Sequence, residues 1–392
     1  MNIGVICSYP VPYGMAATTR IFAYSKGLVE NGNNVDVWSI IPTNFAPQYN
    51  TRNSGKFNGV SFFYSYKCKR HPNNAIHILE CIYSLLILGN RLRKRDKKQK
   101  YDAFIVSSDN IIILMYMSLC NMYLQKKLIF IFDEYPIPIR KKGKSQIPKW
   151  KKRIYKIILR NYDGYISMTN RLLDYYTKIQ NKPGLVISSI TDISRFKNID
   201  KRKDKPNFFK IMYMGNMELS KDNVDNILFA FSLLLQQKQN VLLLLYGKPT
   251  PASKNVLNEI ILQNGLKEKI IWDYAIYDDI PKILSDADIL VSSQPVTTRA
   301  DGGFPTKLGE YLMSGTPTLL TDVGETSQYF VDGEHMYFSI PQSPTDFADK
   351  LKYIIDNYEI ALNVADNGKK LIEKNFSHIS AGIKIENFIK SL

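Results

Sequence analysis

Residues 302–322 read GGFPTKLGEYLMSGTPTLLTD, and this stretch carries the clearest structural signals in the chain. Pro305 presets the backbone for the start of a helix, and Pro317 prevents that helix from continuing. Thr318 to Thr321 then predict a short buried strand. A flexible Gly-Gly turn, a short helix and a buried strand in this order favour an α/β fold.

Lys307 and Glu310 lie three positions apart in the same stretch, so the spacing places both on one face near the helix start. The cation and the free N–H groups of a helix N-terminus suit a diphosphate, and the carboxylate can accept hydrogen bonds from a ribose diol. This chemistry predicts a nucleotide diphosphate site, lined by the preceding residues Gly303, Phe304, Pro305 and Thr306. A surface Lys–Glu pair on an ordinary helix is the alternative for these two residues alone.

The stretch resembles the donor-site segment of retaining GT-B glycosyltransferases of family 4. In that family two Glu residues stand eight positions apart, and the second one holds the ribose of the sugar nucleotide. Glu310 matches the second Glu. The chain departs from the family at the first, where Gly302 stands instead, and Asp301 is the candidate substitute for the contact with the donor sugar.

Two further segments resemble the donor site of that family. In GNMELSKDN, after the predicted strand 210–214, Gly215 allows close backbone approach to a phosphate and Lys221 adds a positive charge. Asn216 replaces a family Arg, and Asp222 replaces a family Gly. A solvated loop charge is the alternative for Lys221. Farther along, Tyr274 and Ala275 match the loop that reads the nucleotide base through backbone groups.

Strand-like and helix-like runs alternate through all 392 residues, which predicts parallel sheets with helices on both faces. The Lys-rich run 197–205 ends in a Pro and reads as a linker. We therefore expect two tandem Rossmann-like doubly wound domains that face a cleft, as in GT-B. Residues 1–197 would bind the acceptor and 206–375 the nucleotide sugar. By the same resemblance, a C-terminal helix over 376–392 would cross back to the first domain.

The acceptor half offers fewer specific signals. Gly14 lies in the loop between the first strand and helix, where the family loop approaches the donor phosphate, and Arg20 follows either towards the cleft or on the helix surface. Asp133 and Glu134 end a buried strand, where an acid can orient or deprotonate an acceptor hydroxyl. We take Glu134 as the catalytic candidate, with a capping or loop role as the alternative.

The net positive charge lies entirely in the first half of the chain. Residues 1–200 hold 31 Lys and Arg against 12 Asp and Glu, which gives +19, whereas the whole chain carries +16. Basic clusters at 91–100 and 140–160, the second with Trp150 on a helical face, predict contact with an anionic membrane surface or a merely solvated basic face. No nucleic-acid motif accompanies them, so we expect no nucleic-acid partner.

Metal and cofactor sites are not predicted. The four Cys and four His are scattered without zinc-site spacing, and no P-loop or nicotinamide fingerprint is present. The first residues lack a secretory leader, and the apolar run Ile76 to Leu88 reads as too short to span a bilayer. We therefore expect a cytoplasmic protein, peripheral on the inner face of the cell membrane.

The sequence thus predicts a metal-independent glycosyltransferase that uses a UDP- or GDP-linked sugar and a glycan or lipid-linked acceptor in bacterial surface polysaccharide synthesis. The family resemblance implies retention of anomeric configuration. Two alternatives remain open at this point. One is a GT-B sugar-nucleotide epimerase, and the other is a catalytically inactive basic scaffold that binds membranes.

Overall fold

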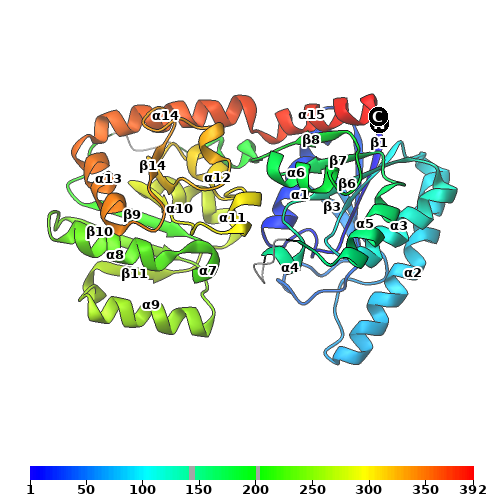
Figure 1. Cartoon of the computed structure of the whole chain (residues 1–392), viewed down its shortest axis with the longest axis horizontal. Helices are drawn as coiled ribbons and strands as arrows, with labels where there is room; N and C mark the ends of the chain where they lie inside the picture. Colours follow the sequence, from blue (N-terminus) through cyan, green and yellow to red (C-terminus); the bar gives the residue numbers. More distant parts are fainter. Residues whose placement is uncertain (141–145, 200–203) are drawn as a thin grey trace. The chain divides into compact units, whose positions relative to one another are not determined.

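The computed structural model describes residues 1–140, 146–199 and 204–392 and divides into two compact units (Figure 1). The first unit comprises residues Met1–Ile190 and Ser377–Leu392, and the second comprises Thr191–Phe376. The chain thus passes from one unit to the other ahead of the Lys-rich run 197–205 that was expected to form the linker. Residues 200–203 of that run lie outside the described residues.

The first unit is built on an eight-stranded sheet in the order β3-β4-β2-β1-β5-β6-β7-β8. Every pair in this sheet is parallel except β3–β4, which is an antiparallel hairpin at one edge. The strands are β1 (Asn2–Cys7), β2 (Asn34–Ser39), β3 (Ser54–Phe57), β4 (Val60–Tyr64), β5 (Ala103–Ser107), β6 (Lys127–Phe132), β7 (Gly164–Ser167) and β8 (Gly184–Val186). The central strands are buried on both faces, which explains their continuous apolar runs.

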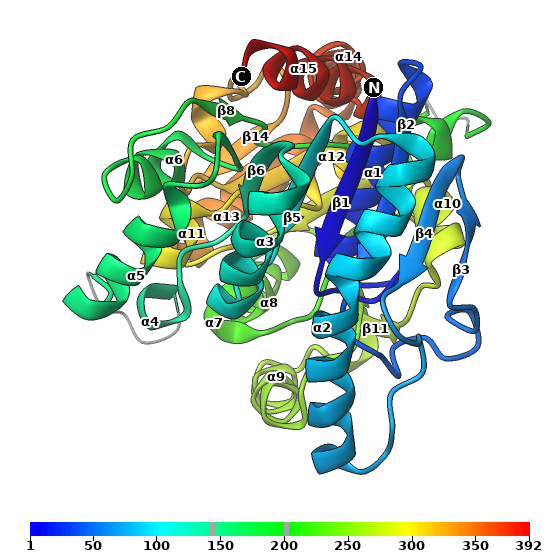
Figure 2. The same cartoon turned by 90° about the vertical axis from the view of Figure 1, so that its right-hand side faces the viewer.

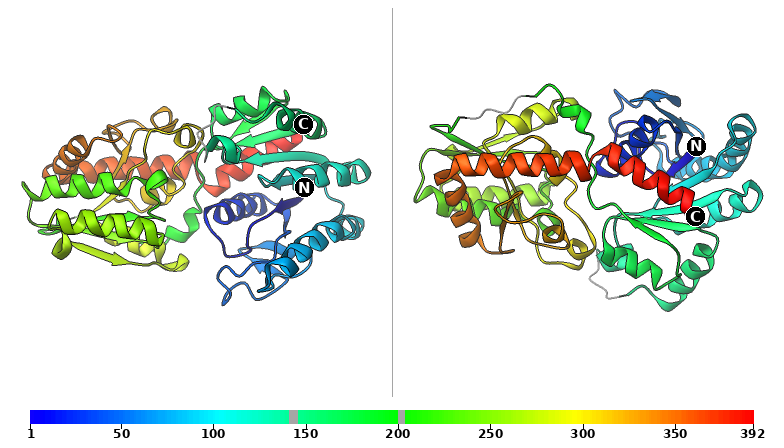
Figure 3. Two further views of the ribbon diagram at one scale, coloured as in Figure 1. Left: turned by 60° about the horizontal axis from the view of Figure 1, so that its bottom comes forward. Right: turned by 90° about the horizontal axis from the view of Figure 1, so that it is seen from above.

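Helices cover both faces of the first sheet. One face packs against α2 (Asn74–Gln99), α3 (Ile111–Leu124), α4 (Ile137–Arg140), α5 (Lys149–Leu159) and α6 (Asn170–Thr177). The other packs against α1 (Ala16–Glu30) and α15 (His378–Ser391), which lie along each other (Figure 3). Gly27 and Gly382 permit this close approach, because a Cβ on Gly27 would lie 1.8 Å from the carbonyl oxygen of His378.

The second unit has a six-stranded parallel sheet in the order β11-β10-β9-β12-β13-β14. Its strands are β9 (Phe209–Met214), β10 (Val241–Tyr246), β11 (Ile270–Asp273), β12 (Ile289–Ser292), β13 (Thr318–Thr321) and β14 (Tyr337–Ser339). Its helices are α7 (Leu219–Asp222), α8 (Val224–Leu235), α9 (Pro251–Gln263), α10 (Ile280–Asp286), α11 (Thr298–Gly302), α12 (Leu308–Met313), α13 (Pro344–Asp356) and α14 (Tyr358–Asn375). The short 3₁₀ turns are η1 (Ile193–Phe196) in the first residues of this unit, η2 (Lys267–Lys269), η3 (Tyr277–Asp279) and η4 (Thr326–Gln328).

Helix α2 continues well beyond the apolar run from Ile76 to Leu88 into the basic residues that follow it. The helix has 26 residues and is therefore about 39 Å long, and its most apolar window has a mean hydropathy of 1.3. Among the described residues it is the one helix whose length and composition suit a membrane span, although part of it packs against the first sheet.

Candidate active site

The order of the second sheet reverses between β9 and β12, because β10 lies on one side of β9 and β12 on the other. In open parallel sheets, ligands bind beyond the carboxyl ends of the strands at such a switch point. Three segments meet there in this unit: the loop that follows β9, the residues that follow β12, and the start of α12. Tyr311 of α12 fastens two of them together, since its hydroxyl accepts the N–H of Met214 at 2.8 Å.

Lys307 sits directly before α12 and points to the loop that follows β9. Its Nζ lies 3.1 Å from Oδ1 of Asp222 and 3.2 Å from the hydroxyl of Tyr213. The same ammonium lies 4.2 Å from the centre of the Tyr213 ring, a cation–π contact. A buried acid therefore holds the Lys307 cation at the switch point.

Burial and charge set the ionisation of this pair. Burial opposes charge on Asp222, but the cations of Lys307 and Lys221 outweigh it and hold the pKa of the Asp222 carboxyl below its ordinary value of 3.8. Burial also lowers the pKa of Lys307, and Asp222 offsets part of that effect. Lys221, half-buried in α7, makes no salt bridge with any carboxylate among the described residues, so its charge stays available to an anion.

The backbone at Gly215 has no room for a side chain. A Cβ there would lie 2.4 Å from the Tyr213 hydroxyl and 2.6 Å from Nζ of Lys307. The neighbouring Gly247 has φ +148°, and its Cβ would meet the carbonyl oxygen of Gly215 at 1.8 Å. Glycine at both positions therefore lets the two loops and the lysine approach one another. Asn216, the next residue, is exposed.

Glu310 has a different set of partners from Lys307. Its Oε1 receives a hydrogen bond from Nη1 of Arg195, which lies in η1. The other guanidinium nitrogen donates to the carbonyl oxygen of Tyr277 at 2.6 Å, and the guanidinium lies 3.9 Å from the centre of the Tyr277 ring. Among the described residues, Oε2 of Glu310 makes no hydrogen bond, so it can still accept one from a ligand.

The residues that lead into α12 differ partly from expectation. Gly302 does not belong to a flexible turn but ends the short helix α11 and is buried, and Asp301 is half-buried in the same helix. The predicted lining residues divide by exposure, since Phe304 and Pro305 are buried, Gly303 is half-buried and Thr306 is exposed. Phe304 packs against the aromatic rings of Tyr329 and Phe330 and so supports the segment from behind.

The predicted base-reading loop follows β11. Tyr274 is 55% exposed, and Nζ of Lys248 lies 3.9 Å from the centre of its ring. Ala275 is half-buried beside it. Burial raises the pKa of Tyr277, two residues farther along, to about 12, so its hydroxyl is neutral in ordinary conditions.

In the first unit, Gly14 lies in the loop after β1, and a Cβ there would lie 2.0 Å from Oγ1 of Thr18. Arg20 is not on the helix surface, because only 5% of it is exposed and its Nε lies 3.0 Å from Oδ1 of Asp133. The Arg20 guanidinium also donates to the carbonyl oxygens of Ile187 and Ser188. Asp133 thus forms an ion pair with Arg20 within this unit, and half-buried Glu134 remains the candidate acid after β6.

Three residues of the site were missed as functional candidates. Arg195 belongs to no motif of the sequence, and only its contact with Glu310 indicates a role at the site. Asp222 was noted as a replaced glycine, yet it holds Lys307. Tyr213 read as a strand residue. The described residues contain no group of three or more His, Cys, Asp or Glu side chains that could hold a metal ion.

Comparisons with solved structures identify the fold. Sucrose-phosphate synthase from Thermosynechococcus elongatus is similar with a TM-score of 0.73 and 14% identity, covering 100% of this chain and 98% of that one. A glycosyltransferase from Rickettsia africae matches with a TM-score of 0.73 and 16% identity, covering 100% and 97%. The Anabaena protein HepE, in complex with UDP and glucose, matches with a TM-score of 0.72 and 13% identity, covering 100% of both chains.

Sequence comparisons match a smaller part of the chain than the structural comparisons do. No curated protein has a sequence that matches this chain. The family model of glycosyl transferases group 1 matches residues 194–371, which lie within the second unit and include Lys307, Glu310 and Arg195. This match over the second unit and the GT-B architecture shared with the solved structures together support a glycosyltransferase.

Proposed function

We propose that the protein transfers a sugar from a UDP- or GDP-linked donor, bound by the second unit, to a hydroxyl of a glycan or lipid-linked acceptor in bacterial surface polysaccharide synthesis. The observation that carries the proposal is the position of Lys307, whose ammonium lies against Gly215 and Asp222 at the switch point of the second sheet. A lysine cation beside a glycine is suited to a diphosphate, because the glycine backbone lets the phosphates come close to the cation.

The diphosphate is the leaving group of this reaction, and it gains negative charge as the bond to the sugar breaks. Lys307 and Lys221 would neutralise that charge, and a cation fixed before the reaction stabilises the transition state at little reorganisation cost. Because α12 has only six residues, we assign this work to the two side chains rather than to the helix dipole. No metal is part of the proposal.

The ribose of the donor would bind Glu310. Arg195 engages one oxygen of that carboxylate and leaves Oε2 able to accept a ribose hydroxyl. In addition, Tyr274 and Ala275 would present the loop that contacts the base. The solved HepE complexes contain UDP or UDP-glucose, which supports a uridine nucleotide as the first donor to test.

On the acceptor side, Glu134 would orient or deprotonate the attacking hydroxyl, and Gly14 would leave room for the donor phosphate. Retention of anomeric configuration belongs to the proposal through the resemblance to family 4. The basic first 200 residues, at +19, would bring the enzyme to the anionic inner face of the cell membrane, where a lipid-linked acceptor is found.

A panel of UDP-, GDP- and ADP-linked sugars, offered with and without lipid-linked and soluble glycan acceptors, tests the proposal by mass spectrometry of the products. Glu310→Gln should lose transfer, whereas Glu268→Gln, an exposed change on the same unit, should keep it. Transfer at the wild-type rate by Glu310→Gln would refute the site. If the protein epimerises a nucleotide sugar in the absence of acceptor, its activity is epimerisation rather than sugar transfer.

A further inference from the structure

The first three turns of α2 bury polar side chains and expose apolar ones, which reverses the usual arrangement. Glu80 is 7% exposed and Ser84 is 1% exposed, whereas Leu79 is 65% exposed and Leu86 is 62% exposed. These turns extend past the sheet of the first unit (Figure 2). An ordinary helix on a soluble domain would turn its leucines to the core.

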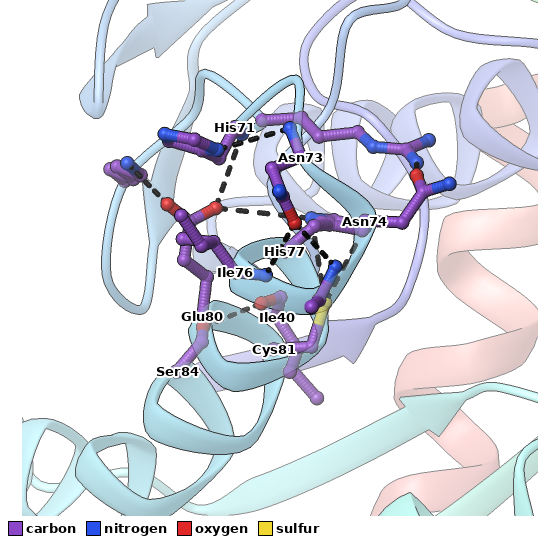
Figure 4. Close-up of polar contacts among 12 residues, drawn as sticks. Ile40, His71, Asn73, Asn74, Ile76, His77, Glu80, Cys81 and Ser84 are labelled. Carbon is purple, nitrogen blue, oxygen red and sulfur yellow. Dashed lines mark hydrogen bonds and ion pairs between the residues drawn. The ribbon is translucent and has the colours of Figure 1, made fainter.

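Polar contacts fix this orientation (Figure 4). The buried Glu80 carboxylate lies 2.6 Å from Nζ of Lys67 and accepts the backbone N–H of His71 at 3.2 Å. Ser84 donates to the carbonyl oxygen of Ile40. Rotating the helix to hide its leucines would break these buried contacts, each of which is costly to leave unsatisfied. The outward apolar face is therefore a stable feature of the fold.

The apolar face continues onto α3. The hydroxyl of Tyr116 in α3 accepts the N–H of Gly89 at 3.2 Å and donates to the carbonyl oxygen of Leu86 at 3.0 Å, so the two helices adjoin at this point. Exposed apolar side chains follow helical spacing on both helices. They are Ile76, Ile78, Leu79, Ile82, Tyr83 and Leu86 on α2, and Ile112, Met115, Leu119, Met122 and Tyr123 on α3. We call these eleven residues the apolar face.

Cations flank the apolar face. The last turns of α2 expose a dense group of basic side chains, and so does α5, which packs beside α3. The basic residues are Arg91, Arg93, Lys94, Lys97 and Lys98 on α2, and Lys149, Lys152, Arg153 and Lys156 on α5, where Trp150 and Ile157 are also exposed. Apolar side chains, an exposed Trp and a basic border together are the features of helices that lie in a membrane interface.

We propose that the apolar face of α2 and α3 inserts into the headgroup–acyl boundary of an anionic bilayer, with the basic side chains of α2 and α5 on the lipid phosphates. Charge complementarity selects this occupant. A second copy of the chain would bring two strongly cationic borders together, whereas anionic lipid neutralises them. The proposal names the lipid-contacting helices for the membrane association proposed above, and it does not depend on sugar transfer.

Insertion in the plane fits α2 better than a complete span. Ser84, Leu88 and Leu92 hold its opposite side against the first unit, so that side cannot face lipid. Its last turns also carry six Lys and Arg side chains between Arg91 and Lys98, which belong at the headgroups. The apolar face is thus a shallow anchor on a folded domain.

The test is flotation of the full-length protein with vesicles of phosphatidylcholine alone and with added phosphatidylglycerol. Leu79→Glu combined with Leu86→Glu removes the centre of the apolar face, and Lys94→Glu with Lys97→Glu removes part of the border. Leu262→Glu and Lys254→Glu on α9 are matched controls, since both residues are exposed in the second unit. Thermal shift with UDP reports whether each variant remains folded with its nucleotide site intact.

We expect wild type and both controls to float with anionic vesicles, the leucine variant to remain in solution, and binding to fall about fivefold for each lost positive charge. All variants should keep the UDP shift. Flotation of the leucine variant like wild type would overturn the proposal. Two other results would also overturn the proposal. In the first, the wild-type protein forms a dimer that the leucine variant does not form, and no protein floats with vesicles. In the second, the same holds for a complex with an oligonucleotide. Failure of sugar transfer with normal flotation would instead count against the proposed function alone.

Discussion

Lys307 and Asp222 form a salt bridge of 3.1 Å at the switch point of the second sheet, and Asp222 is only 2% exposed. The acid fixes the position of the ammonium before any ligand arrives. It also cancels part of the positive charge that a diphosphate would meet. Asp222 therefore has two opposing effects on ligand binding: it holds the Lys307 cation in position, and it lowers the affinity of the site for an anion. The two effects can be separated experimentally.

Asp222→Asn should destabilise the unit while strengthening nucleotide binding. The change leaves Lys307 without its counter-charge, which should lower the free energy of unfolding by about 1–3 kcal/mol. UDP should then restore more stability to the variant than to wild type, because its phosphates meet an unopposed cation. Chemical denaturation with and without UDP measures both quantities. Asp366→Asn, which changes an exposed pair with Lys370, is the control and should alter neither.

The same pair predicts a pH dependence. The lowered pKa of Asp222 means that the folded protein holds the ionised form more strongly than the unfolded chain does. Its stabilising effect is therefore complete above the unfolded value near 3.8 and is lost as the pH falls through the lower folded value. The difference in unfolding free energy between wild type and Asp222→Asn should stay constant above about pH 5 and narrow below about pH 4. A difference that widens in acid would contradict this assignment.

Arg195→Ala should raise KM for the nucleotide sugar about tenfold and change kcat less. Arg195 orients Glu310, and a hydrogen bond between charged groups is worth about 1.5–3 kcal/mol when it holds a ligand contact in place. Steady-state kinetics with varied donor measure the split. Arg195→Lys should restore part of the loss, since it keeps a cation but cannot also reach the Tyr277 carbonyl in the same geometry.

The control for this change is Lys350→Ala, which removes a salt bridge with Asp332 elsewhere in the unit. A purely structural Arg195 would lower stability without moving KM, and that result would remove it from the donor site.

Gly215→Ala should abolish nucleotide binding. The new methyl group would occupy the space of the Tyr213 hydroxyl and of Nζ of Lys307, so the lysine must leave its position. Gly265→Asn is a suitable control, because Gly265 has φ +64° with open space around it and Asn tolerates that conformation. Thermal shift with UDP distinguishes the two variants. An unchanged shift for Gly215→Ala would show that the lysine does not contact the nucleotide.

Secondary structure could be predicted from the sequence where the local pattern of apolar residues matches their burial in the fold. Strand β13 has the predicted bounds, Thr318–Thr321, and β9 begins one residue before the predicted 210–214, because both are short, mostly buried runs. Helix α3 was not predicted, because residues 111–124 are apolar on all sides and show no 3.6-residue period. The inward Glu80 was equally unreadable, since its partner Lys67 lies on another segment and only the tertiary fold brings them together.

The candidate site shows the same division. Lys307, Glu310 and Gly215 could be selected from the sequence because their spacing resembles a family pattern. Arg195 could not, since it is 115 positions away from Glu310 and belongs to no motif. A side chain that holds a functional group in place can be distant in sequence, so it is found from the tertiary structure and not from the spacing within a motif.

Removal of the charge should affect different properties for the two acids that follow β6: protein stability for Asp133 and the rate of transfer for Glu134. Asp133→Asn leaves the guanidinium of Arg20, which is 5% exposed, without its carboxylate partner and should cost about 3 kcal/mol of unfolding free energy. Glu134→Gln should lower kcat, because the proposed role of Glu134 is on the acceptor hydroxyl. Denaturation curves and donor-saturated transfer rates on the two variants measure the contrast. If Glu134→Gln transfers sugar at the full rate, the acceptor base must be another group.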